Sequence, residues 1–175
     1  MRLFFFLILL TSALFSSNLS TLYKYYEKQE YDKGCSYGMK YYKKNRSNEK
    51  YLTLYGLSCL ETDNIDRISK PMLRLNKSKA SRENASYFAT ILLQKQLLKQ
   101  ALLDAKPLGN LRLPKTDFIL SKIFRLFVQK KYQLSDEVYS FEEENIKYQL
   151  YLDDKDKMII DSYQNGKFTK RYRYK

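Results

Sequence analysis

The sequence predicts a mainly α protein, in which about four helical hairpins form a solenoid that is followed by a three-stranded antiparallel β meander. Two observations lead to this fold class. Apolar and small residues recur every 33 or 34 positions within residues 18–141, and alternation of polar and apolar residues replaces that period after Phe141. A repeat of this length is typical of stacked helical pairs, whereas alternation with a period of two indicates strands.

The repeat consists of a large apolar residue three positions before a smaller or helix-packing one. It occurs as Tyr31 and Gly34, Ile65 and Ile68, Leu98 and Ala101, and Tyr132 and Ser135, at intervals of 34, 33 and 34 residues. Apolar or aromatic pairs precede the small positions by nine and eight residues, at Tyr25 and Tyr26, Cys59 and Leu60, Leu92 and Leu93, and Leu126 and Phe127. We therefore expect most tyrosines of the stretch 25–42 to pack between paired helices.

Two segments carry this pattern most clearly, YYEKQEYDKG from Tyr25 and YLTLYGLSCLETDNIDRI from Tyr51. In them the chain resembles the tetratricopeptide repeat, a helix-turn-helix unit of about 34 residues. The resemblance covers residues 18 to about 141. The sequence departs from the family in lacking tryptophan, in replacing the usual alanine at Gly34, Ile68 and Ser135, and in placing Pro71 where it should kink or split a helix.

Helical periodicity is also visible without the repeat. Residues 85–105 and 116–134 carry apolar side chains at helical spacing, and the second segment begins with a Thr-Asp capping signal. Between them, residues 106–115 contain two prolines and a glycine, which indicates a loop.

The C-terminal residues 142–175 are expected to form the β meander. NIKYQLYL from Asn145, MIIDSY from Met158 and KFTKRYRY from Lys167 are the three predicted strands. Asn165 and Gly166 form a strong signal for a two-residue type I′ turn. This turn predicts the cross-strand pairs Tyr163 with Phe168, Asp161 with Lys170, and Ile159 with Tyr172.

The N-terminal residues 1–17 predict a secretory signal peptide. Arg2 supplies the positive region, Leu3–Leu10 is the apolar core, and small and polar residues follow, with cleavage expected between Ser16 and Ser20. Retention of this segment as an uncleaved anchor is the alternative. The expected location is periplasmic or secreted, and loss of Arg2 lowers the net charge from +13 to +12.

The two cysteines, Cys35 and Cys59, both follow the predicted signal peptide. In an oxidising compartment they are candidates for one disulfide, with two buried free thiols as the alternative. The chain has no histidine, which removes the usual structural zinc sites and the catalysis that depends on histidine. We expect no bound metal and no cofactor.

We expect a non-enzymatic protein-protein interaction module. If the family geometry transfers, the resemblance implies a partner-binding inner face at Tyr23, Leu57, Thr90 and Phe124. It also implies a scaffold component of a cell-envelope assembly, such as a secretion system or a flagellar motor. The expected partners are envelope proteins, with weak contact to an anionic polymer or lipid and none to nucleic acid, because export separates the basic C-terminal tail from nucleic acid.

An alternative function is that of an accessory factor or an enzyme that acts on the cell wall through paired carboxylates. Glu27, Glu30 and Asp32 would then serve as acid and base, although neighbouring lysines favour surface ion pairs. The acidic stretch Glu142–Asn145 could bind a cation, but a solvated link between helix and strand is the simpler interpretation.

Overall fold

The computed structural model describes residues 18–175, which divide into two compact units, one ending at Phe88 and one running from Ala89 to Lys175. The boundary falls inside a single helix, α5 (Lys79–Asp104). The predicted signal peptide, residues 1–17, lies outside the described residues. Within residues 18–175, no helix combines the length and the apolar character that a membrane span requires.

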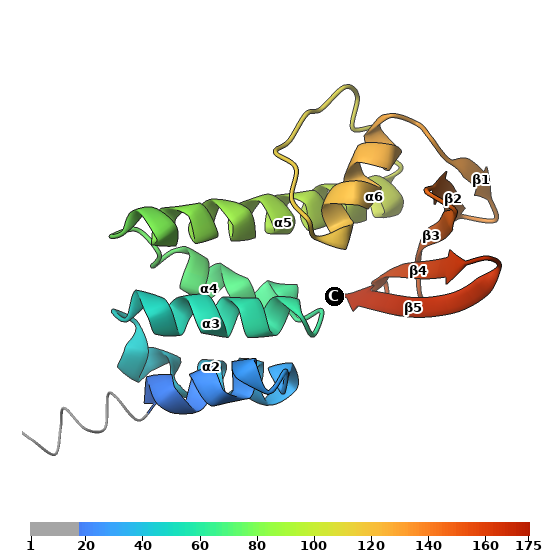
Figure 1. The fold of residues 1–175 in the computed structure, drawn as a ribbon. Helices are drawn as coiled ribbons and strands as arrows, with labels where there is room; N and C mark the ends of the chain where they lie inside the picture. The colour runs from blue at the N-terminus through green and yellow to red at the C-terminus, as the bar shows by residue number, and fades with distance from the viewer. Residues whose placement is uncertain (1–17) are drawn as a thin grey trace, which may run out of the picture. The chain divides into compact units, whose positions relative to one another are not determined.

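The first unit is helical. Its elements are helical residues 18–27, α2 (Tyr31–Asn45), α3 (Glu49–Leu60), the 3-10 helix η1 (Ile65–Ile68), α4 (Ser69–Met72) and the first part of α5. α2 and α3 lie side by side (Figure 1), since only three residues join them. Asn48 caps α3, because its side chain accepts a hydrogen bond from the backbone N–H of Tyr51.

Small residues allow α2 and α3 to approach closely. A Cβ atom at Gly34 would lie 2.7 Å from a serine hydroxyl of α3, and a Cβ atom at Gly38 would overlap the ring of Tyr55. The disulfide between Cys35 and Cys59 crosses the same contact, with Cα atoms 4.7 Å apart. The structure thus contains the candidate disulfide, and both cysteines are buried.

The second unit combines helices with an antiparallel sheet (Figure 1). Its elements are the rest of α5, α6 (Ile119–Val128), β1 (Gln133–Ser135), β2 (Val138–Glu143), β3 (Ile146–Leu152), β4 (Met158–Gln164) and β5 (Lys167–Tyr174). The strands lie in sequence order, each antiparallel to the next. Two β edges result, the short β1 and the longer β5.

The core of the second unit lies between α6 and one face of the sheet. Phe141, Tyr148 and Leu150 alternate with polar residues along β2 and β3 and are buried. From α6, the ring of Phe127 lies 5.1 Å from the ring of Tyr139 on β2. Apolar residues at a period of two in the strands therefore meet an apolar stripe of the helix.

The predicted mainly α fold with a three-stranded meander is wrong, because the sheet described within residues 89–175 has five strands. β1 and β2 occupy residues 133–143, where the prediction placed the end of the fourth helical repeat. α6 ends at Val128, and Lys130 then adopts a φ of 54°, which is incompatible with a continuing helix.

The two additional strands were missed because their turns contain no glycine. Asp136 and Glu137 connect β1 to β2 with φ angles of 49° and 62°, and Glu144 and Asn145 connect β2 to β3 with 55° and 62°. Both turns have the positive φ angles of a type I′ hairpin, which normally favours Asn-Gly or Asp-Gly. Two glutamates at such positions give no turn signal in the sequence.

The repeat positions occupy different environments, so the predicted solenoid of helical hairpins is also wrong. The second pair forms the short η1, whereas Leu98 and Ala101 lie on the continuous helix α5. Ser135, the small position of the fourth repeat, is exposed on β1. Residues 79–104 contain no glycine or proline that could end the helix where a third hairpin would need its turn.

Other local predictions are confirmed. α5 covers nearly all of the predicted helical segment 85–105, and residues 106–115 lie in neither a helix nor a strand. β3, β4 and β5 match the three predicted strands, and Asn165 and Gly166 have the expected positive φ angles of 51° and 75°.

The register of the last hairpin differs from the prediction beyond its first pair. Tyr163 pairs with Phe168 as predicted, but a β-bulge between Ser162 and Tyr163 shifts the remaining pairs by one residue. The observed pairs are Asp161 with Arg171 and Ile160 with Tyr172, in place of Asp161 with Lys170 and Ile159 with Tyr172. A bulge adds a residue to one strand, so alternation alone cannot reveal it.

Candidate functional site

The predicted partner-binding face is divided between the two units. Tyr23 is half exposed and Leu57 is partly buried in the first unit, whereas Thr90 is partly buried in the second. Phe124 is only 3% exposed and belongs to the core beneath α6. It therefore has little surface to offer a partner.

The three carboxylates of the alternative function are Glu27, Glu30 and Asp32, and each lies in an environment common on protein surfaces. Glu27 forms a hydrogen bond with the hydroxyl of Tyr23, one helical turn away, and this bond raises the pKa of Tyr23. Glu30 lies 3.0 Å from Nζ of Lys33 in a surface ion pair. Asp32 is exposed in the first turn of α2, where a negative charge complements the helix dipole.

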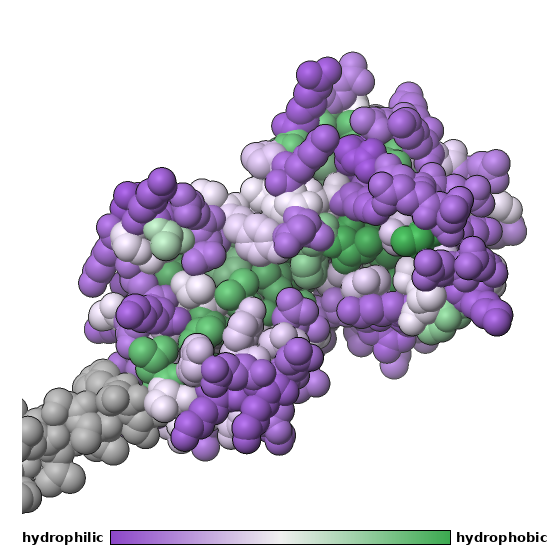
Figure 2. All heavy atoms as spheres, viewed as in Figure 1, coloured by the Kyte–Doolittle hydropathy of each residue, from purple (hydrophilic) through white to green (hydrophobic). Residues whose placement is uncertain are grey.

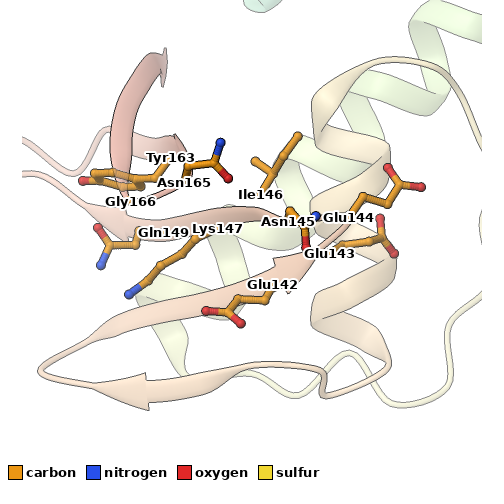
Figure 3. A pocket seen from close by; sticks show the side chains of 10 residues that line it. All are labelled: Glu142, Glu143, Glu144, Asn145, Ile146, Lys147, Gln149, Tyr163, Asn165 and Gly166. Atoms are coloured by element: carbon orange, nitrogen blue, oxygen red, sulfur yellow. The ribbon is translucent and has the colours of Figure 1, made fainter.

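The acidic stretch between β2 and β3 lines an open pocket of about 780 Å³ (Figure 3). Glu143 and Glu144 lie beside α6, whereas Glu142 points away from it, toward the side of its cross-strand partner Lys147. The carboxylates thus diverge. Among residues 18–175, no group of three or more Asp, Glu, Cys or His is placed to hold a metal ion.

Glu143 forms ion pairs with two basic residues of α6. Nη2 of Arg125 donates to both of its carboxylate oxygens, at 2.6 and 2.7 Å, and Nζ of Lys122 lies 3.6 Å away. The hydrogen bond from Arg125 holds the pKa of Glu143 below its ordinary value, although burial opposes this shift. Glu143 therefore stays ionised at neutral pH and cannot serve as a general acid there.

A second ion pair lies on the other face of the sheet, where Asp161 is only 2% exposed. Arg171 donates from Nε and Nη2 to the two oxygens of Asp161, at 2.7 and 2.8 Å, and the hydroxyl of Tyr151 donates at 3.0 Å. The bond from Arg171 lowers the pKa of Asp161 and outweighs the opposing effect of burial. This cluster ties β3, β4 and β5 together, so its first role is in folding.

β5 is the longer of the two edge strands of the sheet. It pairs with β4 on one side, and within the described part of the chain no strand pairs with its other side. Residues 167–171 and Arg173 are exposed, including the ring of Phe168 at 55%. From Lys167 to Lys175 the chain carries cations and no acidic residue.

Hydrophilic side chains cover most of the face seen in Figure 2, with smaller groups of apolar residues between them. A cluster of aromatic rings borders a smaller pocket of about 210 Å³, which includes Phe127, Tyr132 and Tyr139. Stacking between these rings accounts for their positions without a ligand.

Comparison of the chain with protein-family models, with curated proteins and with solved structures finds no match. The case for a function therefore rests on the geometry of the described residues.

Sequence analysis missed both ion pairs of the second unit. Arg125 lies 18 residues from Glu143, and Asp161 lies 10 residues from Arg171, so neither pair has a local motif. Alternation did place Asp161 opposite a cation, but the bulge made that cation Arg171. The predicted meander does place the segment from Lys167 as its last strand, and β5 has that edge position in the sheet.

Proposed function

We propose that the protein is an exported, non-enzymatic interaction module of the cell envelope, periplasmic in location, which binds an extended acidic segment of a partner protein along β5. The observation that carries this proposal is the open edge of β5, eight residues long. An edge strand offers backbone N–H and C=O groups in a row, and a partner segment can add to the sheet as a further strand.

The charge of β5 supports an acidic partner. Lys167, Lys170 and Lys175 have no opposite charge among the residues of this segment, and Phe168 adds an exposed apolar surface. Lysines on an edge also repel a second copy of the same strand, which protects the protein from pairing with itself. An acidic strand would turn this repulsion into attraction.

Export is supported by two independent features. The apolar segment Leu3–Leu10 follows a positive residue in the pattern of a signal peptide. The disulfide between Cys35 and Cys59 is of the kind that persists in oxidising compartments. Two of the carboxylates with lowered pKa values, Glu143 and Asp161, are engaged by arginine, which supports a binding role rather than acid catalysis.

Photocrosslinking in the intact envelope tests this function. A photoreactive residue placed at Phe168, which is 55% exposed on β5, should give one adduct with an acidic segment of a single partner. The control site is Leu134, which is 56% exposed on the opposite edge strand β1 and should give no such adduct. Equal adducts at the two sites would contradict the proposal.

Charge reversal sharpens the same experiment. Lys167→Glu combined with Lys170→Glu should reduce the adduct by about tenfold or more, since complementary charge sets the association rate. The matched control, Lys115→Glu combined with Lys131→Glu, makes the same charge change at exposed positions outside β5. An adduct that survives charge reversal on β5, or that falls equally in the control, would count against an acidic partner on this edge.

A further inference from the structure

The link between α2 and α3 borders a strongly cationic pocket in the first unit. The pocket, of about 590 Å³, is lined by Lys43, Lys44, Arg46, Lys50, Lys77 and one acidic residue, Glu49. Within residues 18–175, none of the five cationic side chains forms an ion pair with a carboxylate. The pocket therefore holds uncompensated positive charge.

Glu49 supplies one negative charge against the five cations, and its carboxylate is already held by hydrogen bonds. It accepts backbone N–H groups from Asn76, Lys77 and Ser78, at 3.0, 2.7 and 3.1 Å. Burial favours a higher pKa for Glu49, but these hydrogen bonds and one from Ser81 lower it to about 2. The same bonds hold Lys77 against the α2–α3 link and complete the pocket.

The five cations differ in how the helix dipoles affect them. Lys43 and Lys44 lie in the last turn of α2, where positive charge stabilises a helix. Lys50 lies in the first turn of α3, and Lys77 lies two residues before α5 begins. At these positions the positive end of each helix repels a cation, so both lysines oppose local stability. A local conflict of this kind is expected where a site serves binding.

We propose that this pocket binds a phosphate-bearing ligand with at least two phosphoryl groups. Five cations and the first residues of α3 line one concavity, and ammonium and guanidinium groups bind phosphate through charge-assisted hydrogen bonds. A multiply charged anion in this pocket would reduce the repulsion among the cations. The hydrogen bonds of Glu49 to the backbone would remain intact. This site is distinct from β5 and does not depend on the proposed protein partner.

Titration calorimetry of the exported protein with tripolyphosphate tests the site. Binding should saturate at one ligand per chain and weaken with salt, because exposed charges are screened. Lys50→Gln combined with Lys77→Gln should weaken binding by about tenfold or more, whereas Lys115→Gln combined with Lys131→Gln should change it by less than about twofold. Absence of saturable binding, or equal weakening in both variants, would overturn the proposal.

Thermal unfolding supplies a second readout. The variant with Lys50→Gln and Lys77→Gln should have a midpoint equal to or above that of the wild type without ligand, and it should lose most of the increase that tripolyphosphate gives the wild type. A lower midpoint without ligand would show that these lysines support the fold, which would overturn the electrostatic argument.

Vesicles distinguish a lipid headgroup from a free phosphate compound as the source of this chemistry. Cosedimentation with vesicles of cardiolipin, whose headgroup carries two phosphates, in phosphatidylcholine, inhibited by tripolyphosphate and lost in the variant with Lys50→Gln and Lys77→Gln, would identify a lipid headgroup. Saturable binding of tripolyphosphate without cosedimentation would identify a free phosphate compound. If neither probe binds, the site does not exist.

Discussion

The two units of the molecule handle positive charge in different ways. In the second unit, Arg125 and Arg171 each hold a carboxylate through two short hydrogen bonds. In the first unit, the cations around the α2–α3 link have no carboxylate partner among the described residues, and the adjacent Glu49 is bonded to backbone N–H groups instead. Arg125 and Arg171 thus contribute to the stability of the second unit, whereas Lys50 and Lys77 lie where the dipole of a helix disfavours a cation.

The units also differ in what holds them together. The first unit is crosslinked by Cys35 and Cys59 across the contact between α2 and α3. The second unit contains no cysteine and depends on strand register, on the apolar surface beneath α6 and on its ion pairs. The disulfide can therefore offset the repulsion between surface cations of the first unit, a means of stabilisation that the second unit lacks.

Removal of the disulfide is expected to have the largest effect, and one confined to the first unit. Cys35→Ala combined with Cys59→Ala should lower the stability of α2 and α3 by about 3 kcal/mol, since a bond across 24 residues restricts the unfolded chain. Hydrogen exchange should show faster exchange in α2 and α3 and unchanged exchange in β3 and β4.

The control for this experiment is a reducing agent, which should affect the wild type and leave the double alanine variant unchanged. Equal acceleration of exchange in both units would contradict the division of stability between them.

Acid should weaken the first unit through Glu49. Its pKa is lowered from 4.5 to about 2, mainly because backbone hydrogen bonds outweigh the effect of burial. The ionised carboxylate therefore stabilises the fold above pH 4.5, and this stabilisation is lost as pH falls from 4.5 to about 2. In urea titrations, Glu49→Gln should be less stable than the wild type at neutral pH and should approach it at the acid end of this range.

A matched control for this acid effect is Glu142→Gln, at an exposed residue of β2. Its stability should follow that of the wild type across the same pH range. A constant difference between Glu49→Gln and the wild type at all pH values would show that the charge of Glu49 has no role.

The smallest expected effect is a gain of stability in the second unit. Glu137 has a φ of 62°, and a left-handed conformation costs a residue with a side chain about 1 to 2 kcal/mol. Glu137→Gly should therefore raise the free energy of unfolding by up to about 1 kcal/mol, after the greater freedom of glycine in the unfolded chain is subtracted.

The same substitution inside a strand should act in the opposite direction. Glu142→Gly places glycine in the extended backbone of β2 and should lower the stability by about 0.5 to 1 kcal/mol. Equal destabilisation of both glycine variants in chemical denaturation would contradict a cost of the left-handed conformation at Glu137.

The sequence could predict those features that depend on neighbouring residues. The helical pattern of residues 85–105, the loop at 106–115 and the three last strands were all predicted, because side-chain periodicity and glycine or proline signals are local. The candidate pair Cys35 and Cys59 was also identified, although only the close approach of α2 and α3 decides that they bond.

Features that depend on distant residues could not be predicted. The apparent repeat matched residues such as Ile68 and Ser135, which the fold places in a 3-10 helix and on an exposed strand. Tetratricopeptide-like spacing does not specify which helices become neighbours, because packing partners are selected in three dimensions.

The sequence by itself determined the basic charge, the absence of histidine, the single pair of cysteines and the local preference for helix or strand. The tertiary structure alone decided that Glu137 and Glu144 adopt turn conformations, that a bulge places Arg171 opposite Asp161, and that Lys77 joins the cations of the α2–α3 link. The physical reason is that charge and periodicity belong to the order of residues, whereas strand register and converging charges arise only when distant segments pack together.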